Sequence, residues 1–161
     1  MENNGLIITR VFDAPVEEVW KYWSIPEYFK KWWGPKDFTC PFANIDFRVG
    51  GKYLVAMHGP AGSPFDKDMW STGTYKEIIP AQKIVVSDSF ADEKGNIVPA
   101  TYYGMPGSFP IEATITTTFE DLNGKTKMML NYPSTQGIAK EMIDNMSQGW
   151  NQSFDKIAAT L

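Results

Sequence analysis

One stretch near the carboxyl end limits what this chain can fold into, because its pattern predicts a long helix with one wide apolar face. At ~100° per residue, six apolar residues of positions 136–161 fall within about 40° of Trp150. They are Ala139, Ile143, Met146, Phe154, Ile157 and Leu161. The opposite side carries Glu141, Asp144, Gln148, Gln152 and Asp155. A one-sided helix of about seven turns needs a broad apolar partner, which the rest of the chain must supply.

The predicted start of this helix follows Pro133, with Ser134 or Thr135 as the N-cap residue. Gly149 lies inside the helix, on the flank of its apolar face. A glycine in a helix interior costs roughly 1 kcal/mol relative to alanine. We therefore expect a packing or functional reason for Gly149.

The preceding chain predicts a sheet. A first strand covers residues 5–13, and two short helices follow, one carrying Val19 and Trp20 and one opening at Pro26. Six further strands are predicted at 38–46, 52–58, 70–79, 83–90, 111–120 and 125–132. Their connections are too short for parallel crossovers, so the sheet should be antiparallel. Asn123-Gly124 is a strong signal for a two-residue hairpin.

Alternation along the strands indicates one dry and one solvated face. The apolar set in two strands is Ile111, Ala113, Ile115, Thr117 and Phe119, then Met128, Leu130 and Tyr132. The long helix belongs on this dry face, which gives an α+β fold. The connection 91–110 contains glycine, proline and the pair Tyr102-Tyr103, and at that length we expect a functional rim or lid.

Composition excludes several classes of function. The 161 residues suit a single domain, 1–161, with 43% apolar and 21% charged residues. A net charge of −4 gives no support for a nucleic-acid or anionic-membrane partner. We expect no membrane span, because no run reaches ~18 apolar residues. The lone cysteine, Cys40, and the lack of a signal-peptide pattern favour a reducing, cytoplasmic location.

Histidine and cysteine are too scarce for most catalytic and metal sites. His58 is the single histidine and precedes Gly59-Pro60 at a strand end, where a solvated residue is favoured over a catalytic one. Metal sites need several His, Cys or clustered carboxylates, so we expect none. No Gly-rich phosphate loop connects a strand to a helix, and we expect no cofactor.

Asp88 is the strongest polar candidate. It alternates with Ile84, Val86 and Phe90 and so lies on the apolar side of its strand. A carboxylate in a pocket could orient a ligand or act as a general base with a raised pKa. The alternative is a strand-end residue in water or bonded to the adjacent loop.

Three other groups have both a structural and a binding interpretation. Asp46 and Arg48 share one strand face, where an ion pair is favoured over ligand contact. Four tryptophans could line a pocket mouth or pack the helices on the sheet: Trp20, Trp23, Trp32 and Trp33. Six methionines are adaptable fillers of a core or of a tolerant pocket: Met57, Met69, Met105, Met128, Met142 and Met146.

Five local motifs occur in order along the chain. They are Phe12-Asp13-Ala14-Pro15 with Val19-Trp20, Trp32-Trp33-Gly34-Pro35 with Phe38-Thr39, residues 46–51 with Tyr53, Gly73 with Tyr75, Glu77 and Ile78, and Gly149-Trp150 with Phe154, Ile157 and Leu161. Together they resemble the branch of the START-like superfamily named after the activator of heat-shock protein 90 ATPase. The superfamily has the helix-grip fold of the birch-pollen allergen and polyketide cyclases. The resemblance runs from about Leu6 to Leu161 and does not include the extra N-terminal domain of the true co-chaperone.

The resemblance implies a cavity between the sheet and the long helix, suited to a small apolar ligand. The residue pattern also predicts a cavity, because a curved sheet covered by a helix with one apolar face often leaves space between them. We predict noncatalytic binding of a small hydrophobic or aromatic molecule. The predicted ligand-binding residues are Trp20, Trp33, Tyr53, Val55, Met57, Tyr75, Asp88, Ile115, Met146, Gly149 and Trp150. The alternatives are a co-chaperone-like module with a protein partner, or a cyclase- or lyase-type enzyme using Asp88, Tyr53 or Tyr75.

Overall fold

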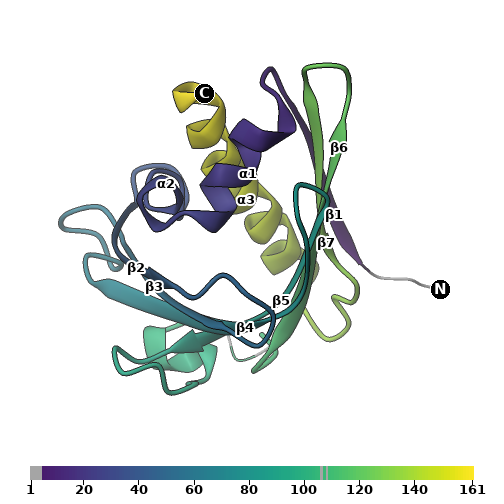
Figure 1. Ribbon diagram of the computed structural model, residues 1–161. Coiled ribbons are helices and arrows are strands. Elements are labelled where there is room, and N and C mark those ends of the chain that lie inside the picture. Colours follow the sequence, from purple (N-terminus) through teal and green to yellow (C-terminus); the bar gives the residue numbers. More distant parts are fainter. Residues whose placement is uncertain (1–4, 106, 108) are drawn as a thin grey trace.

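The computed structural model describes residues 5–105, 107 and 109–161. Figure 1 shows the order of its elements along the chain. They are β1 (Leu6–Phe12), α1 (Val16–Ser24), α2 (Pro26–Phe29), β2 (Thr39–Ile45), β3 (Lys52–His58), β4 (Asp68–Ile79), β5 (Lys83–Ala91), the 3-10 helix η1 (Ala100–Tyr103), β6 (Ala113–Asp121), β7 (Thr126–Tyr132) and α3 (Lys140–Thr160).

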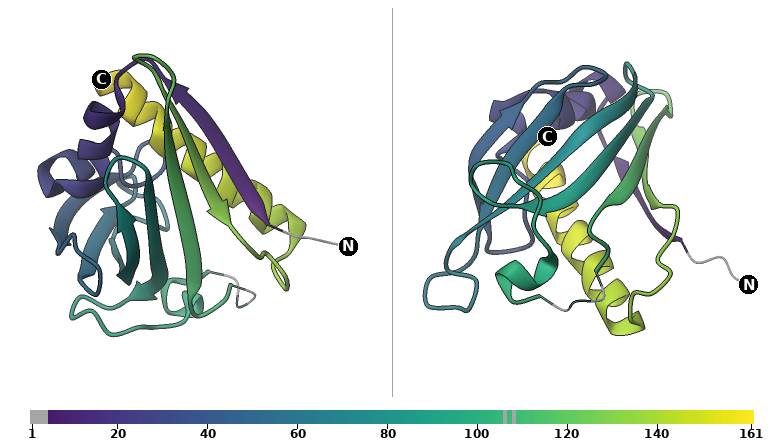
Figure 2. Two further views of the ribbon diagram at one scale, coloured as in Figure 1. Left: turned by 45° about the vertical axis from the view of Figure 1, so that its right-hand side comes forward. Right: turned by 90° about the horizontal axis from the view of Figure 1, so that it is seen from below.

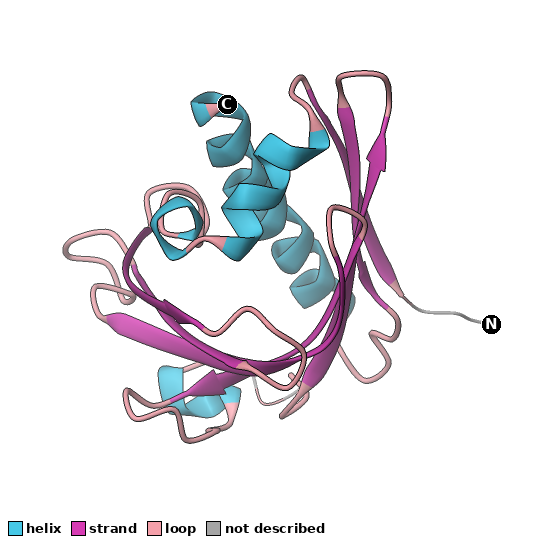
Figure 3. Cartoon of the chain, in the orientation of Figure 1, coloured by secondary structure: helices cyan, strands magenta, loops and turns pink. Residues whose placement is uncertain are grey.

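In the described part of the chain, seven strands form one antiparallel sheet in the order β1-β7-β6-β5-β4-β3-β2. The sheet curls around α3, while α1 and α2 lie across one end of its concave face (Figures 1 and 3). This arrangement confirms the predicted α+β helix-grip fold. The predicted hairpin between β6 and β7 is also present, with Asn123 and Gly124 at φ values of 59° and 99°.

The buried side of the sheet is the one that alternation predicts. Ile115 and Phe119 of β6 are buried, as are Met128 and Leu130 of β7. Ile111 departs from the pattern with 56% of its surface exposed, because β6 begins only at Ala113. The concave face is therefore dry, and the helices cover it.

The long helix is shorter than its apolar pattern suggests. It begins at Lys140, not near residue 136, and Ala139 occupies the N-cap position. Gly137 has a φ of 86°, which is outside the helical region and separates the preceding turn from α3. Ala139 and Leu161, at the two ends of the predicted apolar face, are both exposed.

The carboxyl-terminal half of α3 holds the helix to the rest of the fold. The fully buried side chains of α3 are Ser153, Phe154 and Ile157, and all lie in this half. Here the Lys156 ammonium donates to the carbonyl oxygens of Gly34 and Phe38, both at 2.8 Å. Figure 2 shows α1 beside this half of the helix. Between Lys140 and Gly149 no side chain of α3 is fully buried.

None of the helices in the described part of the chain combines the length and apolar character that a membrane span needs. Cys40 is a buried free thiol on β2, and burial raises its pKa to about 11.

Candidate functional site

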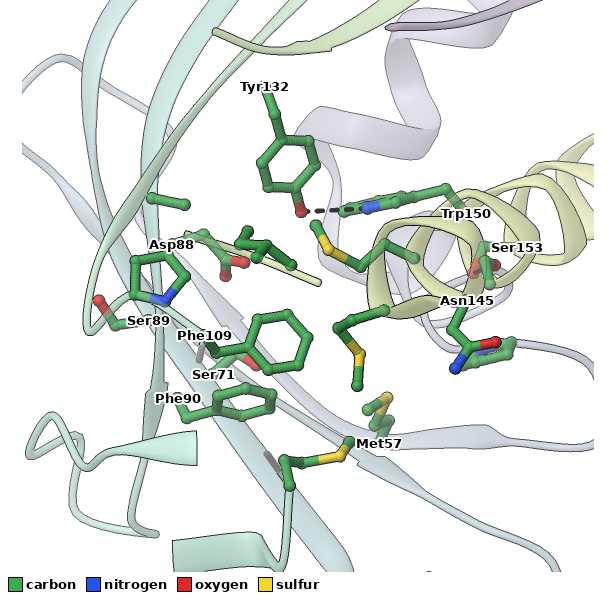
Figure 4. Close-up of a pocket in the computed structure, with 18 of the residues that line it drawn as sticks. Met57, Ser71, Asp88, Ser89, Phe90, Phe109, Tyr132, Asn145, Trp150 and Ser153 are labelled. Carbon is green, nitrogen blue, oxygen red and sulfur yellow. Dashed lines mark hydrogen bonds between the residues drawn. The ribbon is translucent and has the colours of Figure 1, made fainter. Parts of the chain in front are cut away.

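A cavity of about 260 Å³ lies between the sheet and the less buried half of α3. We call it the main cavity. Figure 4 shows its wall, to which β5 contributes Asp88 and Phe90, β7 contributes Tyr132 and α3 contributes Asn145 and Trp150. Because apolar side chains dominate the wall, a ligand in this space would be largely removed from water.

The structure brings six of the predicted site residues together at the main cavity. They are Trp33, Met57, Asp88, Met146, Gly149 and Trp150. Three others border a second, small cavity of about 30 Å³: Tyr53, Tyr75 and Ile115. The rings of Trp33 and Trp150 line both cavities and lie 5.6 Å apart between centroids, in edge-to-face contact. The two aromatic side chains thus form the boundary between the cavities.

Two predicted residues lie outside both cavities. Trp20 packs edge-on against Phe47 and Phe119, with centroid distances of 5.6 and 5.2 Å. Val55 is fully buried in the core. Among the other tryptophans, Trp32 is fully buried and donates its indole N–H to the Tyr22 carbonyl. The tryptophan cluster therefore divides between helix packing and the cavity wall.

Several lining residues are absent from the predicted set. They include Ser71, Phe90, Met105, Phe109, Tyr132, Met142 and Asn145. Signals for some of them were present in the sequence. Phe90 and Tyr132 lie on the apolar side of their strands, and Met105 falls in the connection predicted to form a rim. Four of the six adaptable methionines line the cavity, whereas Met69 and Met128 are buried in the core.

Asp88 provides the acidic group of the main cavity. Its Oδ1 accepts a hydrogen bond of 2.5 Å from the Tyr53 hydroxyl, which reaches it from β3. In the described part of the chain, no group donates a hydrogen bond to the other carboxylate oxygen, Oδ2. Burial raises the pKa of Asp88, although the hydrogen bond from Tyr53 acts in the opposite direction. Burial, together with the nearby Asp88 charge, also raises the pKa of Tyr53.

Gly73 explains how Tyr53 can reach Asp88 across the intervening strand. Tyr53 and Gly73 are paired residues on β3 and β4. A Cβ atom at Gly73 would lie 2.6 Å from the Tyr53 ring and 1.8 Å from the Ser87 carbonyl oxygen. Only glycine leaves room for both neighbours, so this motif glycine positions the carboxylate partner.

Tyr132 supplies a second polar group at the same cavity. Its hydroxyl oxygen accepts a hydrogen bond of 3.1 Å from the indole N–H of Trp150 (Figure 4). This contact ties β7 to the middle of α3. Burial and the charge of Asp88 both raise the pKa of Tyr132.

The charged side chains of the cavity wall are of one sign. Asp88 is the single acidic side chain among the described lining residues, and none of those residues is Lys, Arg or His. Within residues 5–105, 107 and 109–161, no group of three or more His, Cys, Asp and Glu side chains is arranged to hold a metal ion. The wall can therefore offer a ligand apolar contact, aromatic faces, hydroxyl and amide groups, and one carboxyl group.

The other polar candidates lie away from the main cavity. The two ring nitrogens of His58 contact Asp68 and Asp66, both at 2.7 Å. Hydrogen bonds to Asp68 and Asp66 raise the pKa of His58. Arg48 Nε donates to both carboxylate oxygens of Asp46 at 3.0 Å, which is the ion pair that their spacing favours.

The motifs and the fold agree with a comparison of the sequence with known families. Residues 13–161 match the family described as activator of Hsp90 ATPase homolog 1-like protein, AHSA1. The chain belongs to this family. The predicted resemblance to the branch of the START-like superfamily named after that activator is thereby confirmed.

Solved structures similar to this AHSA1 member include a protein from Arthrobacter aurescens with a TM-score of 0.77 and 27% identity, covering 96% of this chain and 84% of that one. A protein from Chromobacterium violaceum has a TM-score of 0.75 and 27% identity, covering 98% and 96%. An AHSA1 protein from Silicibacter pomeroyi shares the fold, with a TM-score of 0.74 and 19% identity, covering 97% and 96%. A comparison with curated proteins gives no match.

Proposed function

We propose that the chain binds a small hydrophobic or aromatic molecule in the main cavity, without chemical change to that molecule. The observation that carries the proposal is the space itself, about 260 Å³ between sheet and helix. A cavity of this kind leaves side chains without packing partners on one side, which costs stability. An apolar ligand would restore those contacts and remove the cavity wall from water.

The glycine of α3 supports the proposal. Gly149 lines the main cavity, and a Cβ atom there would meet only Pro35, at 3.7 Å. No packing against the sheet requires a glycine, although this residue costs the helix roughly 1 kcal/mol relative to alanine. Open space for a ligand is a functional reason for keeping it.

Two substitutions at this residue test the proposal. Gly149→Leu should fold with near-normal stability and fill part of the cavity, so that ligand binding falls. Gly149→Ala is the matched control, because it improves helix propensity without adding atoms that reach far into the space. Thermal unfolding with 1-naphthalenemethanol supplies the measurement, since a ligand at 100 times its dissociation constant adds ~2.7 kcal/mol.

We expect wild type and Gly149→Ala to be stabilised by the alcohol, and Gly149→Leu to be stabilised much less. Equal stabilisation of all three proteins would place the ligand elsewhere. If neither this compound nor a wider panel of apolar compounds stabilises wild type, the binding proposal fails.

A second candidate is an acid–base enzyme of cyclase or lyase type. It is favoured by the hydrogen-bonded pair Asp88 and Tyr53 at the cavity wall, since a carboxyl group with a raised pKa suits proton transfer. Mass spectrometry of the same panel after incubation tests it. A product formed by wild type and not by Asp88→Asn would replace the noncatalytic proposal. The third alternative, a chaperone partner, rests on the family description.

A further inference from the structure

We propose that the main cavity selects a hydrophobic amine, with its ammonium group paired to Asp88 and its apolar body between the sheet and α3. This inference rests on the proposed function, because it names the chemical class of ligand for the same cavity. The inference distinguishes compounds that share an apolar body but differ in their polar group. The cavity volume alone does not discriminate among amines, neutral compounds and carboxylic acids.

The charge of the wall is the first argument. Asp88 is the one acidic group there, and the described lining residues include no cationic side chain. A carboxylate ligand would find no positive partner and would face the carboxylate of Asp88. Like charges in a site of low polarity repel strongly, and each loses its hydration on entry. Fatty-acid-like ligands are therefore disfavoured by this wall.

The unused hydrogen-bonding capacity of Asp88 is the second argument. Tyr53 holds Oδ1 from one side, and this contact fixes the carboxyl group at the cavity. No described residue donates to Oδ2, which borders the cavity and is not sealed from solvent. A ligand that displaces water from this oxygen without offering a donor leaves it unpaired, which is costly. A neutral hydrocarbon would leave it unpaired, whereas an ammonium group carries both the charge and the donors that it lacks.

The neighbours of Asp88 in the cavity provide the third argument. Figure 4 shows the Tyr132 hydroxyl and the Asp88 carboxyl group directed toward the same space, with Phe90 and Phe109 nearby. Aromatic faces attract cations, and the attraction grows where water is excluded. The hydroxyl oxygen of Tyr132 adds a second acceptor. An ammonium group could interact with all three features: the hydroxyl oxygen, the carboxyl group and the aromatic faces.

Three ligands with the same ring system test the inference: 1-naphthylmethylamine, 1-naphthalenemethanol and 1-naphthoic acid. Isothermal titration calorimetry at pH 7 gives their dissociation constants. For wild type we expect the amine to bind about tenfold more tightly than the alcohol, and the acid to bind most weakly. In Asp88→Asn the advantage of the amine over the alcohol should fall to about twofold or less.

The alcohol is an internal control, because its binding to Asp88→Asn shows that the variant is folded and its cavity open. Tyr53→Phe is a second variant, which keeps the carboxyl group and removes only its hydrogen-bond donor. The preference for the amine should be smaller in it than in wild type, because Tyr53 fixes the carboxyl group, but larger than in Asp88→Asn. A preference no larger than that of Asp88→Asn would contradict the pairing with Asp88.

The remaining outcomes separate this inference from the proposed function. If the alcohol or the acid binds wild type as tightly as the amine, the inference is overturned and the binding function stands. An equal preference for the amine in wild type and Asp88→Asn would also overturn it, because the selection would then arise elsewhere. If none of the three compounds and no hydrocarbon binds wild type, the proposed function fails and the inference fails with it.

Discussion

Asp88 is placed where its charged form is disfavoured. Its carboxyl group is partly buried at the cavity wall, and among the described residues Tyr53 donates the one hydrogen bond that it accepts. A carboxyl group with a folded-state pKa above its unfolded value of about 3.9 binds its proton more tightly in the folded protein. Folding then becomes less favourable as the pH rises from that value through the raised folded-state pKa.

Asp88→Asn should therefore change how stability depends on pH. Relative to wild type, we expect the variant to gain free energy of unfolding between pH 4 and pH 7, because asparagine has no charge to bury. Urea denaturation of both proteins at pH 4.0, 5.5 and 7.0 measures the difference. Glu93→Gln, at an exposed position with no ion pair among the described residues, controls for the loss of one negative charge. A difference that is constant across this range would contradict the burial of a charged carboxylate.

Single residues also show where sequence-based prediction ends. Alternation with Ile84 and Phe90 was sufficient to predict that Asp88 lies on the apolar side of its strand. Its hydrogen bond with Tyr53 was not predictable, because the partners are 35 residues apart and meet only across Gly73. Trp20 and Trp33 have the same apolar character, and only their packing partners decide which one reaches the cavity.

The two halves of α3 differ in how they contribute to folding. Ile157 is fully buried, whereas Met146 is partly buried and lines the main cavity. Ile157→Ala should cost about 2–5 kcal/mol, the usual range for a large-to-small change in a core. Met146→Ala should cost clearly less, because one side of its side chain already faces space. Urea denaturation of the two variants gives the comparison, and equal losses would contradict the division of the helix.

Strands were easier to predict than the ends of the helix. Each predicted strand is present to within two residues at either end, because period-two alternation and turn residues mark strands locally. The start of α3 was misplaced, since the cap-like residues before it belong to a turn formed at Gly137. The apolar periodicity of α3 predicted which face turns inward, but not that half of this face lies over open space.

The covered concave face makes α3 part of the folding unit. Removing residues 134–161 would expose the apolar side chains that Phe154 and Ile157 cover. We expect a chain ending at Pro133 to lose cooperative thermal unfolding, followed by circular dichroism. Adding a peptide of residues 134–161 should restore a transition at least in part. A sharp, reversible transition of the shortened chain alone would show that the sheet is stable without the helix.

The position of the main cavity could not be predicted from the sequence, because it depends on the spacing between the sheet and α3. The strand patterns predicted which face of the sheet is apolar, and the helix pattern predicted which element covers that face. Neither pattern predicts how far the curled sheet lies from Met146 or Gly149. Residues from the connection before β6 complete the wall, and their role as a rim was predicted only from the length of that segment.

The unequal halves of α3 also bear on how such a protein can diverge. Substitutions around Ile157 threaten the fold, and selection should remove them in every lineage. Substitutions at wall positions such as Met142 or Met146 cost little stability and change the shape offered to a ligand. After gene duplication, a few substitutions at wall positions could therefore change the ligand specificity of one copy, while the fold stays the same.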